Sequence, residues 1–163
     1  MFNKNKLEKE LSDLNLNGKS AFTSTNLIKV YFAKLFKDAE RYCIYANQIG
    51  QENLSFVDEN IEYLYDLIVL EFENNNPMQN LLGTKLVLES EWGKEKEIID
   101  DFNKLLIANS EYKALVFQSS SFQDYTTFIS QLKSRIDAYS PKIGKYFLCC
   151  FVNHKSLFEV HEA

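Results

Sequence analysis

The chain has few of the residues that mark several special classes of protein. It contains only five glycines and two prolines among 163 residues, which excludes a collagen-like or low-complexity composition. Hydrophobic residues make up 45% and charged residues 25%, as in an ordinary globular protein. We therefore expect a single domain over residues 1–163 that is long enough to bury a substantial core.

Long apolar runs and paired cysteines are also missing. The sequence contains no run of about 18 apolar residues, which is the length needed to span a membrane. The charged N-terminal segment also lacks the apolar region of a signal peptide. Cys43, Cys149 and Cys150 are odd in number and lack CxxC spacing, and adjacent cysteines rarely bridge each other. These features predict reduced, buried thiols in a cytoplasmic protein with no membrane partner.

Positive charge is in deficit. The 18 lysines and arginines are outnumbered by 23 acidic residues, which gives a formal net charge of -5. This balance argues against a protein dedicated to coating nucleic acid, although a local basic patch can coexist with an acidic total. A cluster of metal-binding carboxylates would add to the negative sum.

Hydrophobic periodicity predicts alternating helices and strands. Apolar residues at three- and four-residue steps indicate helices over residues 4–14, 25–49, 94–109 and 119–141. Branched and aromatic runs indicate strands over residues 54–72, 84–92, 112–118 and 144–152, with a last edge strand over 156–163. This order predicts an α/β sandwich with a mixed sheet.

Neither the Gly18-Lys19-Ser20 segment nor Trp92 is interpreted as part of a functional site. Gly18-Lys19-Ser20 is faintly similar to a phosphate-binding loop, but Asp13 stands where the first glycine of that motif belongs and no apolar strand precedes it. We therefore reject a phosphate loop. Trp92 is interpreted as packing at the end of a strand.

Three carboxylates stand out around the predicted strand over residues 84–92. Glu89 and Glu91 are two residues apart, so their side chains point to the same face of a strand. If the strands on either side of Met78 form an antiparallel hairpin, Asp66 lies opposite the segment between the two glutamates. Crowded carboxylates repel one another, and a hard cation such as Mg²⁺, which prefers oxygen ligands, relieves that repulsion.

The same residues resemble a known family. Asp66, then Glu89-Ser90-Glu91 on the neighbouring strand, then a helix and a buried strand, is similar to the PD-(D/E)xK nuclease superfamily, with glutamate at the position of the motif's lysine. The resemblance implies a three-layer, restriction endonuclease-like sandwich with a core over residues 25–118 and a C-terminal helix and strands over 119–163. It also implies Mg²⁺-dependent (or Mn²⁺-dependent) cleavage of DNA. The resemblance is compatible with a homodimer as well as with a monomer.

The resemblance also implies roles for individual residues. Asp66 and Glu89 would ligate the metal, and Glu91 would act as a base or a further ligand. Because the motif lysine is missing, Lys104 on the following helix is expected to supply the positive charge, ahead of Lys85. Two alternatives remain open: the glutamates form the solvent face of an edge strand, or the fold is a non-catalytic interaction or nucleic-acid-binding domain.

Overall fold

The computed structural model describes residues 4–37, 42–61, 63–141, 143–153 and 155–162. The helices are α1 Lys4–Ser12, α2 Ala21–Lys37, α3 Glu95–Ile107 and α4 Phe122–Ala138, and the short 3₁₀ helices are η1 Gln51–Phe56 and η2 Glu73–Asn75. The strands are β1 Tyr42–Ala46, β2 Leu67–Phe72, β3 Leu81–Glu91, β4 Ser110–Ser119, β5 Lys145–Val152 and β6 Lys155–Glu162.

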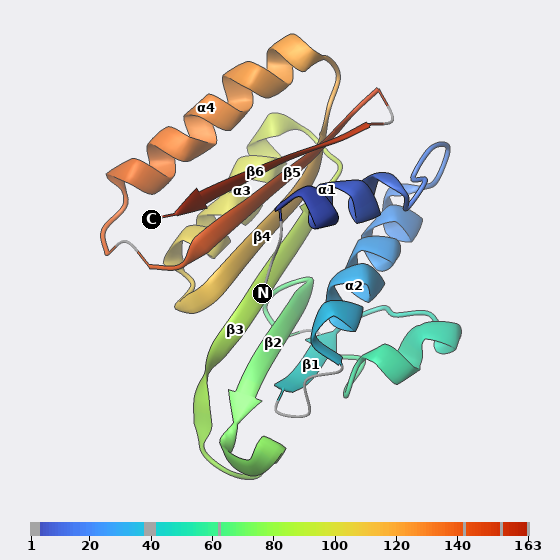
Figure 1. Cartoon of the computed structure of the whole chain (residues 1–163), viewed down its shortest axis with the longest axis vertical. Helices are drawn as coiled ribbons and strands as arrows, with labels where there is room; N and C mark the ends of the chain where they lie inside the picture. Colours follow the sequence, from blue (N-terminus) through green and yellow to red (C-terminus); the bar gives the residue numbers. More distant parts are fainter. Residues whose placement is uncertain (1–3, 38–41, 62, 142, 154, 163) are drawn as a thin grey trace.

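In the described part of the chain, six strands form one mixed sheet whose order follows the sequence, from β1 to β6 (Figure 1). The pairs β1–β2, β2–β3 and β5–β6 are antiparallel. The pairs β3–β4 and β4–β5 are parallel, and α3 and α4 connect them. The carboxyl ends of β3, β4 and β5 therefore lie at one edge of the sheet.

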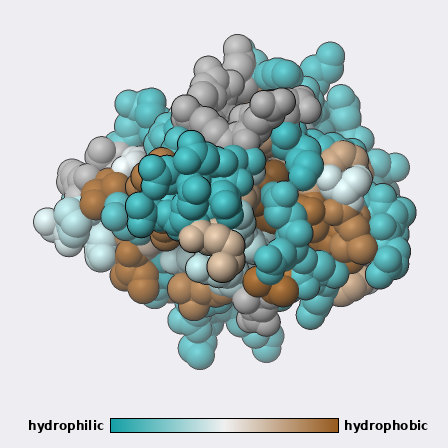
Figure 2. Space-filling model, turned by 90° about the horizontal axis from the view of Figure 1, so that it is seen from below, coloured by the Kyte–Doolittle hydropathy of each residue, from teal (hydrophilic) through white to brown (hydrophobic). Residues whose placement is uncertain are grey.

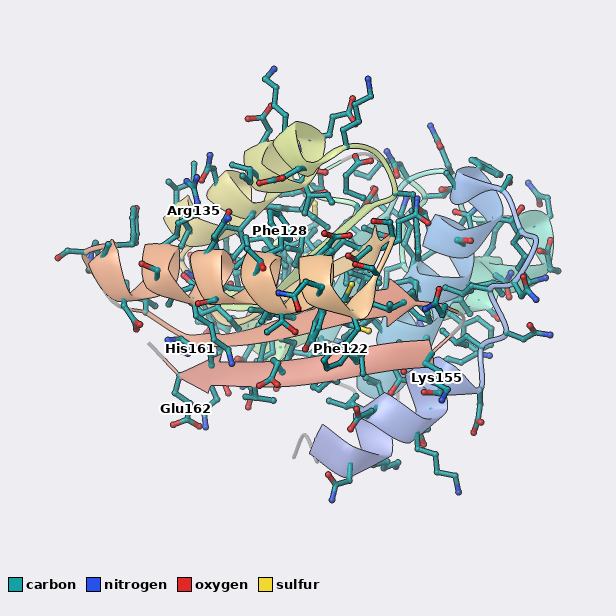
Figure 3. The ribbon with its side chains drawn as sticks, turned by 90° about the horizontal axis from the view of Figure 1, so that it is seen from above. Phe122, Phe128, Arg135, Lys155, His161 and Glu162 are labelled. Carbon is teal, nitrogen blue, oxygen red and sulfur yellow. The ribbon has the colours of Figure 1, made fainter. Side chains whose placement is uncertain are left out.

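Helices cover both faces of this sheet. One apolar cluster joins α1 and α2 to one face, and a second joins α3 and α4 to the other. Figures 1 and 3 show the same division, with α1 on one side of β5 and β6 and with α3 and α4 on the other. Along β3, Leu86 and Leu88 belong to the first cluster and Val87 to the second. Strand alternation therefore directs Glu89 and Glu91 toward α3.

Most of the predicted elements are confirmed, including three of the four helices and the strands that became β3, β4, β5 and β6. Residue 163, at the end of the predicted edge strand, lies outside the described residues. The α/β class and the mixed sheet are likewise confirmed. The three cysteines are free and buried, as expected. No helix in the described ranges is long and apolar enough to cross a membrane.

The predicted helix over residues 25–49 is wrong in its second half. Helix α2 begins at Ala21, where the Ser20 hydroxyl accepts the Thr23 N–H at 3.2 Å, and it runs to Lys37. Residues 38–41 lie outside the described residues, and Tyr42–Ala46 form strand β1. All five side chains of β1 are buried, so apolar residues occur there at every spacing and satisfy a helical pattern by coincidence.

The predicted strand over residues 54–72 is correct only for its last third, which is β2. The preceding segment forms η1 and a loop, because its polar side chains bind backbone groups that a strand would have paired. Asp58 Oδ2 accepts the Ile44 N–H at 2.7 Å, and Asn60 Oδ1 accepts the Ile49 N–H at 3.0 Å.

The two ends of the parallel strands differ in character. A shallow groove at the amino ends of β3 and β4 is lined by the exposed apolar residues Leu81, Leu82 and Ile143. Figure 2 views the molecule from below and shows that apolar surface on this face occurs in separate patches between hydrophilic side chains. The carboxylates singled out above lie instead toward the carboxyl end of β3.

Candidate functional site

The hairpin expected from the sequence is present. Strands β2 and β3 pair in antiparallel register, with Leu67 opposite Leu88. Asp66 immediately precedes β2, and its Oδ2 accepts the backbone N–H of Ser90 at 2.8 Å. The fold thus brings Asp66 to the segment between Glu89 and Glu91, where the register argument placed it.

Asp66 is held by a lysine from the opposite face of the sheet. Lys29 of α2 is only 1% exposed, and its Nζ lies 3.3 Å from Asp66 Oδ1. The same ammonium donates to Asn47 twice, to Oδ1 at 2.7 Å and to the backbone carbonyl at 3.1 Å. A charge this deeply buried is tolerated only with such partners. The ion pair therefore holds the side chains of Lys29 and Asp66 in position.

Glu89 is the most perturbed carboxyl group of the site. It is 4% exposed. Its buried Oε1 forms an ion pair with Lys104 Nζ at 3.3 Å and has no other polar partner among the described residues. Burial, followed by the charges of Asp101 and Asp66, raises the pKa of Glu89 to about 8, against the opposing effect of Lys104. Glu89 therefore lies in an acidic pocket whose negative charge Lys104 offsets only in part.

Lys104 spans two carboxylates at the surface of this pocket. Its Nζ lies 2.7 Å from Asp101 Oδ1 on the same helix and 3.3 Å from Glu89 on β3. Partial burial works to lower the pKa of Lys104, but the hydrogen bond that Lys104 donates to Asp101 and the charge of Glu89 outweigh it and raise that pKa. Lys104 is thus a permanent cation beside Glu89, and its side chain remains 46% exposed.

The remaining predicted residues are placed differently. The Glu91 carboxylate accepts the backbone N–H of Gly93 at 2.6 Å, so the described contacts tie it to the start of α3. Lys85 forms an ion pair with Glu111 of β4 and lies over the Tyr112 ring at 5.6 Å. Of the two lysines considered, the structure brings Lys104 and not Lys85 to Glu89.

Three further residues belong to the site and were missed from the sequence. Lys29 was overlooked because a helical lysine is normally solvated, although it lies within the apolar segment Leu27–Val30. Asp101 was overlooked because an acidic residue on a helix is normally solvated, but its side chain is only 17% exposed and its charge raises the pKa of Glu89. Tyr65 precedes Asp66 and is 8% exposed; burial, and then the charge of Glu89, raises the pKa of its hydroxyl.

The donor set suits a hard cation held by few protein ligands. No group of three or more histidine, cysteine, aspartate or glutamate side chains in the described ranges is arranged to hold a metal ion. Mg²⁺, however, is usually bound through one or two carboxylates and completes its shell with water and phosphate oxygens. Glu89, whose Oε1 has Lys104 as its only partner among the described residues, and the neighbouring Asp66 are the two carboxylates that could serve in this way.

Comparison of the chain with protein-family models, with curated proteins and with solved structures gives no match.

Proposed function

We propose that this chain is a Mg²⁺-dependent nuclease that hydrolyses phosphodiester bonds in DNA, on a three-layer fold of the restriction endonuclease type. The order of elements supports the proposal: α2 is followed by antiparallel β1, β2 and β3, by α3, and by β4 parallel to β3. The PD-(D/E)xK resemblance implies this order. The helices on both faces of the mixed sheet agree with the proposed layers.

The environment of Glu89 is the observation that carries the proposal. A structural carboxylate in a protein interior normally acquires hydrogen bonds that keep it ionised. Glu89 instead has a buried oxygen whose only partner among the described residues is Lys104, two acidic neighbours and a pKa raised to about 8. A divalent cation between Glu89 and Asp66 would stabilise the ionised form of Glu89, and it would offset the free-energy cost of burying this carboxylate beside two acidic residues.

The residues would divide the work as follows. Asp66, oriented by Lys29 and the Ser90 N–H, and Glu89 would hold the cation. When bound, Mg²⁺ would neutralise phosphate charge and activate a water molecule for attack. Lys104 would stabilise the negative charge that develops on the phosphate, because it is charged, partly exposed and adjacent to Glu89. Glu91 is the proposed base, and breaking its bond to Gly93 would free it for that role.

A non-catalytic interaction domain on the same fold is the second candidate. It is favoured by the fact that a lysine already lies 3.3 Å from each of the two proposed ligands. In that case the ion pairs serve stability alone, and the acidic pocket has no ligand.

Cleavage assays separate the two candidates. The substrates are a supercoiled plasmid and a labelled single strand, each with Mg²⁺ or Mn²⁺. We expect the wild type to cleave and Glu89→Gln to lose cleavage while keeping its fold, because the amide preserves shape but removes the charge that holds the cation. Glu52→Gln is the matched control, since Glu52 is exposed and bonds only to Asn53 among the described residues.

Lysine variants test the role of Lys104. Lys104→Ala should lower the cleavage rate about 100-fold or more, as removal of one stabilising charge commonly does, and should have less effect on the metal concentration required. Lys96→Ala is the control on the same helix, because Lys96 is exposed and pairs with Asp100. Absence of cleavage by the wild type under all four conditions would favour the non-catalytic domain.

A further inference from the structure

A second polar cavity lies at the carboxyl edge of the parallel strands, apart from the carboxylates. Its volume is about 560 Å³, within the roughly 300–1,000 Å³ typical of small-molecule sites. Trp92 follows β3, Gln118 and Ser119 end β4, and Phe151 and Asn153 belong to the end of β5 and its turn. The segment joining α1 to α2 closes the other side. Ligands of α/β sheets commonly bind beyond the carboxyl ends of their strands.

One wall of the cavity is aromatic and rigidly held. The Trp92 indole N–H donates to Thr25 Oγ1 at 2.9 Å, which fixes the orientation of its ring. The centroid of the Phe151 ring lies 5.8 Å from that of the Trp92 ring, so the two rings are packed together. Both side chains are partly exposed and line the cavity, so their packing leaves apolar surface open to a ligand. The strand-end packing expected of Trp92 is present, and the same ring has this second surface.

Most of the other lining side chains can form hydrogen bonds, and none of them is negatively charged. Amide side chains come from Asn15, Asn17, Gln118 and Asn153. Among the described lining residues Lys19 alone is charged, and it is positive, although the whole chain carries a net charge of -5. In the neighbouring cavity between α3 and α4, by contrast, Glu95 and Asp124 are part of the wall. The aromatic cavity is thus the one suited to an anionic ligand.

The side-chain amides that line the cavity have donors and acceptors that are not used in hydrogen bonds to the described residues. Within the described ranges, the side chains of Asn15, Asn17 and Asn153 make no hydrogen bond to the protein, and Gln118 uses one N–H to bind the Trp92 carbonyl. An amide offers both donors and an acceptor, which is the combination needed to bind the edge of a nucleobase. Aromatic faces stack on bases without regard to their identity.

We propose that this cavity binds one unpaired nucleotide of the nucleic acid substrate, with its base against Trp92 and Phe151 and its phosphate toward Lys19. The proposal rests on the proposed function for its choice of substrate. A short chain of contacts joins the two sites: Asp66 accepts from the Ser90 N–H, the Ser90 hydroxyl lies 3.3 Å from Thr25 Oγ1, and Thr25 holds the Trp92 ring. A nucleotide in the cavity is therefore next to the phosphate at the carboxylates, and the substrate has an unpaired base there.

Fluorescence of Trp92 tests the cavity directly, because it is the only tryptophan of the chain. The four deoxynucleoside 5′-monophosphates are titrated into the protein without metal, and deoxyribose 5-phosphate serves as the ligand that lacks a base. We expect saturable quenching by at least one nucleotide and none by the sugar phosphate. A single-stranded oligonucleotide should quench at lower concentration than a blunt duplex of the same sequence.

A matched pair of variants locates the ligand. Asn17→Ala removes a cavity amide and should weaken nucleotide binding about fivefold, the usual effect of one hydrogen bond. Asn80→Ala removes an exposed amide that bonds Glu73 in the β2–β3 connection and should leave binding unchanged. Phe151→Ala should also weaken binding, and circular dichroism of each variant confirms that it is folded.

The outcomes for the cavity and for the nuclease are separable. Unchanged Trp92 fluorescence with all four nucleotides overturns the cavity proposal even if plasmid cleavage persists. Equal quenching by deoxyribose 5-phosphate, or equal affinity of the wild type, Asn17→Ala and Phe151→Ala, also overturns it. Saturable, base-dependent quenching that these variants weaken supports the cavity proposal, and the absence of cleavage in the same preparation would then refute only the nuclease.

Discussion

Replacing Glu89 by glutamine should change how the stability of the protein depends on pH. The Glu89 carboxyl has a pKa raised from 4.5 to about 8 in the folded state, chiefly through burial. Between these two values the folded protein holds a proton that the unfolded chain releases, so the free energy of unfolding falls as the pH rises. The full contribution is present below pH 4.5 and is lost by about pH 8.

The size of the effect follows from the same two pKa values. Each pH unit between them lowers the stability by about 1.4 kcal/mol, so the wild type should lose about 3 kcal/mol from pH 5 to pH 7 through Glu89 alone. For a chain of this length the loss corresponds to a fall of about 6–12 °C in melting temperature. Glu89→Gln cannot ionise, and it should lose about 3 kcal/mol less than the wild type over this range.

Urea unfolding at a series of pH values, followed by circular dichroism, measures both free energies. The difference between the two proteins cancels the contributions of the other titrating groups. We expect that difference to grow in favour of Glu89→Gln from pH 5 upward and to level off near pH 8. Parallel curves would mean that Glu89 titrates normally, and the argument for a buried carboxylate that Lys104 compensates only in part would then fail.

Three other changes test the surroundings of the site. At pH 8, millimolar Mg²⁺ should raise the melting temperature of the wild type but not of Asp66→Asn, because only the wild type retains both proposed ligands; equal shifts would rule out a site at Asp66. Lys29→Met should lower the free energy of unfolding by about 3 kcal/mol, since it leaves Asp66 without its buried cation; an unchanged urea midpoint would contradict the role given to Lys29. Burial lowers the pKa of Lys113 from 10.5 to about 8. The free energy of unfolding of the wild type should therefore rise by about 3 kcal/mol between pH 8 and pH 10.5 relative to that of Lys113→Met. Equal changes in the two proteins, measured by urea unfolding, would contradict this shift.

The elements with strong, long patterns were predictable from the sequence, and short ambiguous ones were not. Helix α3 has an apolar stripe that includes Phe102, and β4 has a nearly unbroken apolar run, so length and period agree in each case. Strand β1 has five residues, too few to distinguish a buried strand from the end of a helix. Its state is decided by pairing with β2, more than twenty residues later in the chain.

The same distinction applies to the site. Asp66 and Glu89 could be paired from the sequence because a short hairpin sets their register locally. Lys29 could not be assigned, because its burial depends on an acidic partner from the other side of the sheet. The cavity beside Trp92 was equally hidden, since the segment that closes it comes from the N-terminal fifth of the chain and Phe151 comes from β5.

The order of the strands has a consequence for how the protein folds. Because each strand of the sheet neighbours the strand that precedes it in the sequence, the sheet can grow by one strand at a time as the chain leaves the ribosome. Helix α1 is the exception: it packs on β6, where the Ser156 hydroxyl donates to the Glu8 carbonyl at 3.1 Å. Helix α1 therefore cannot dock until β6 has been synthesised, since the contact joins residues that are 148 positions apart in the chain.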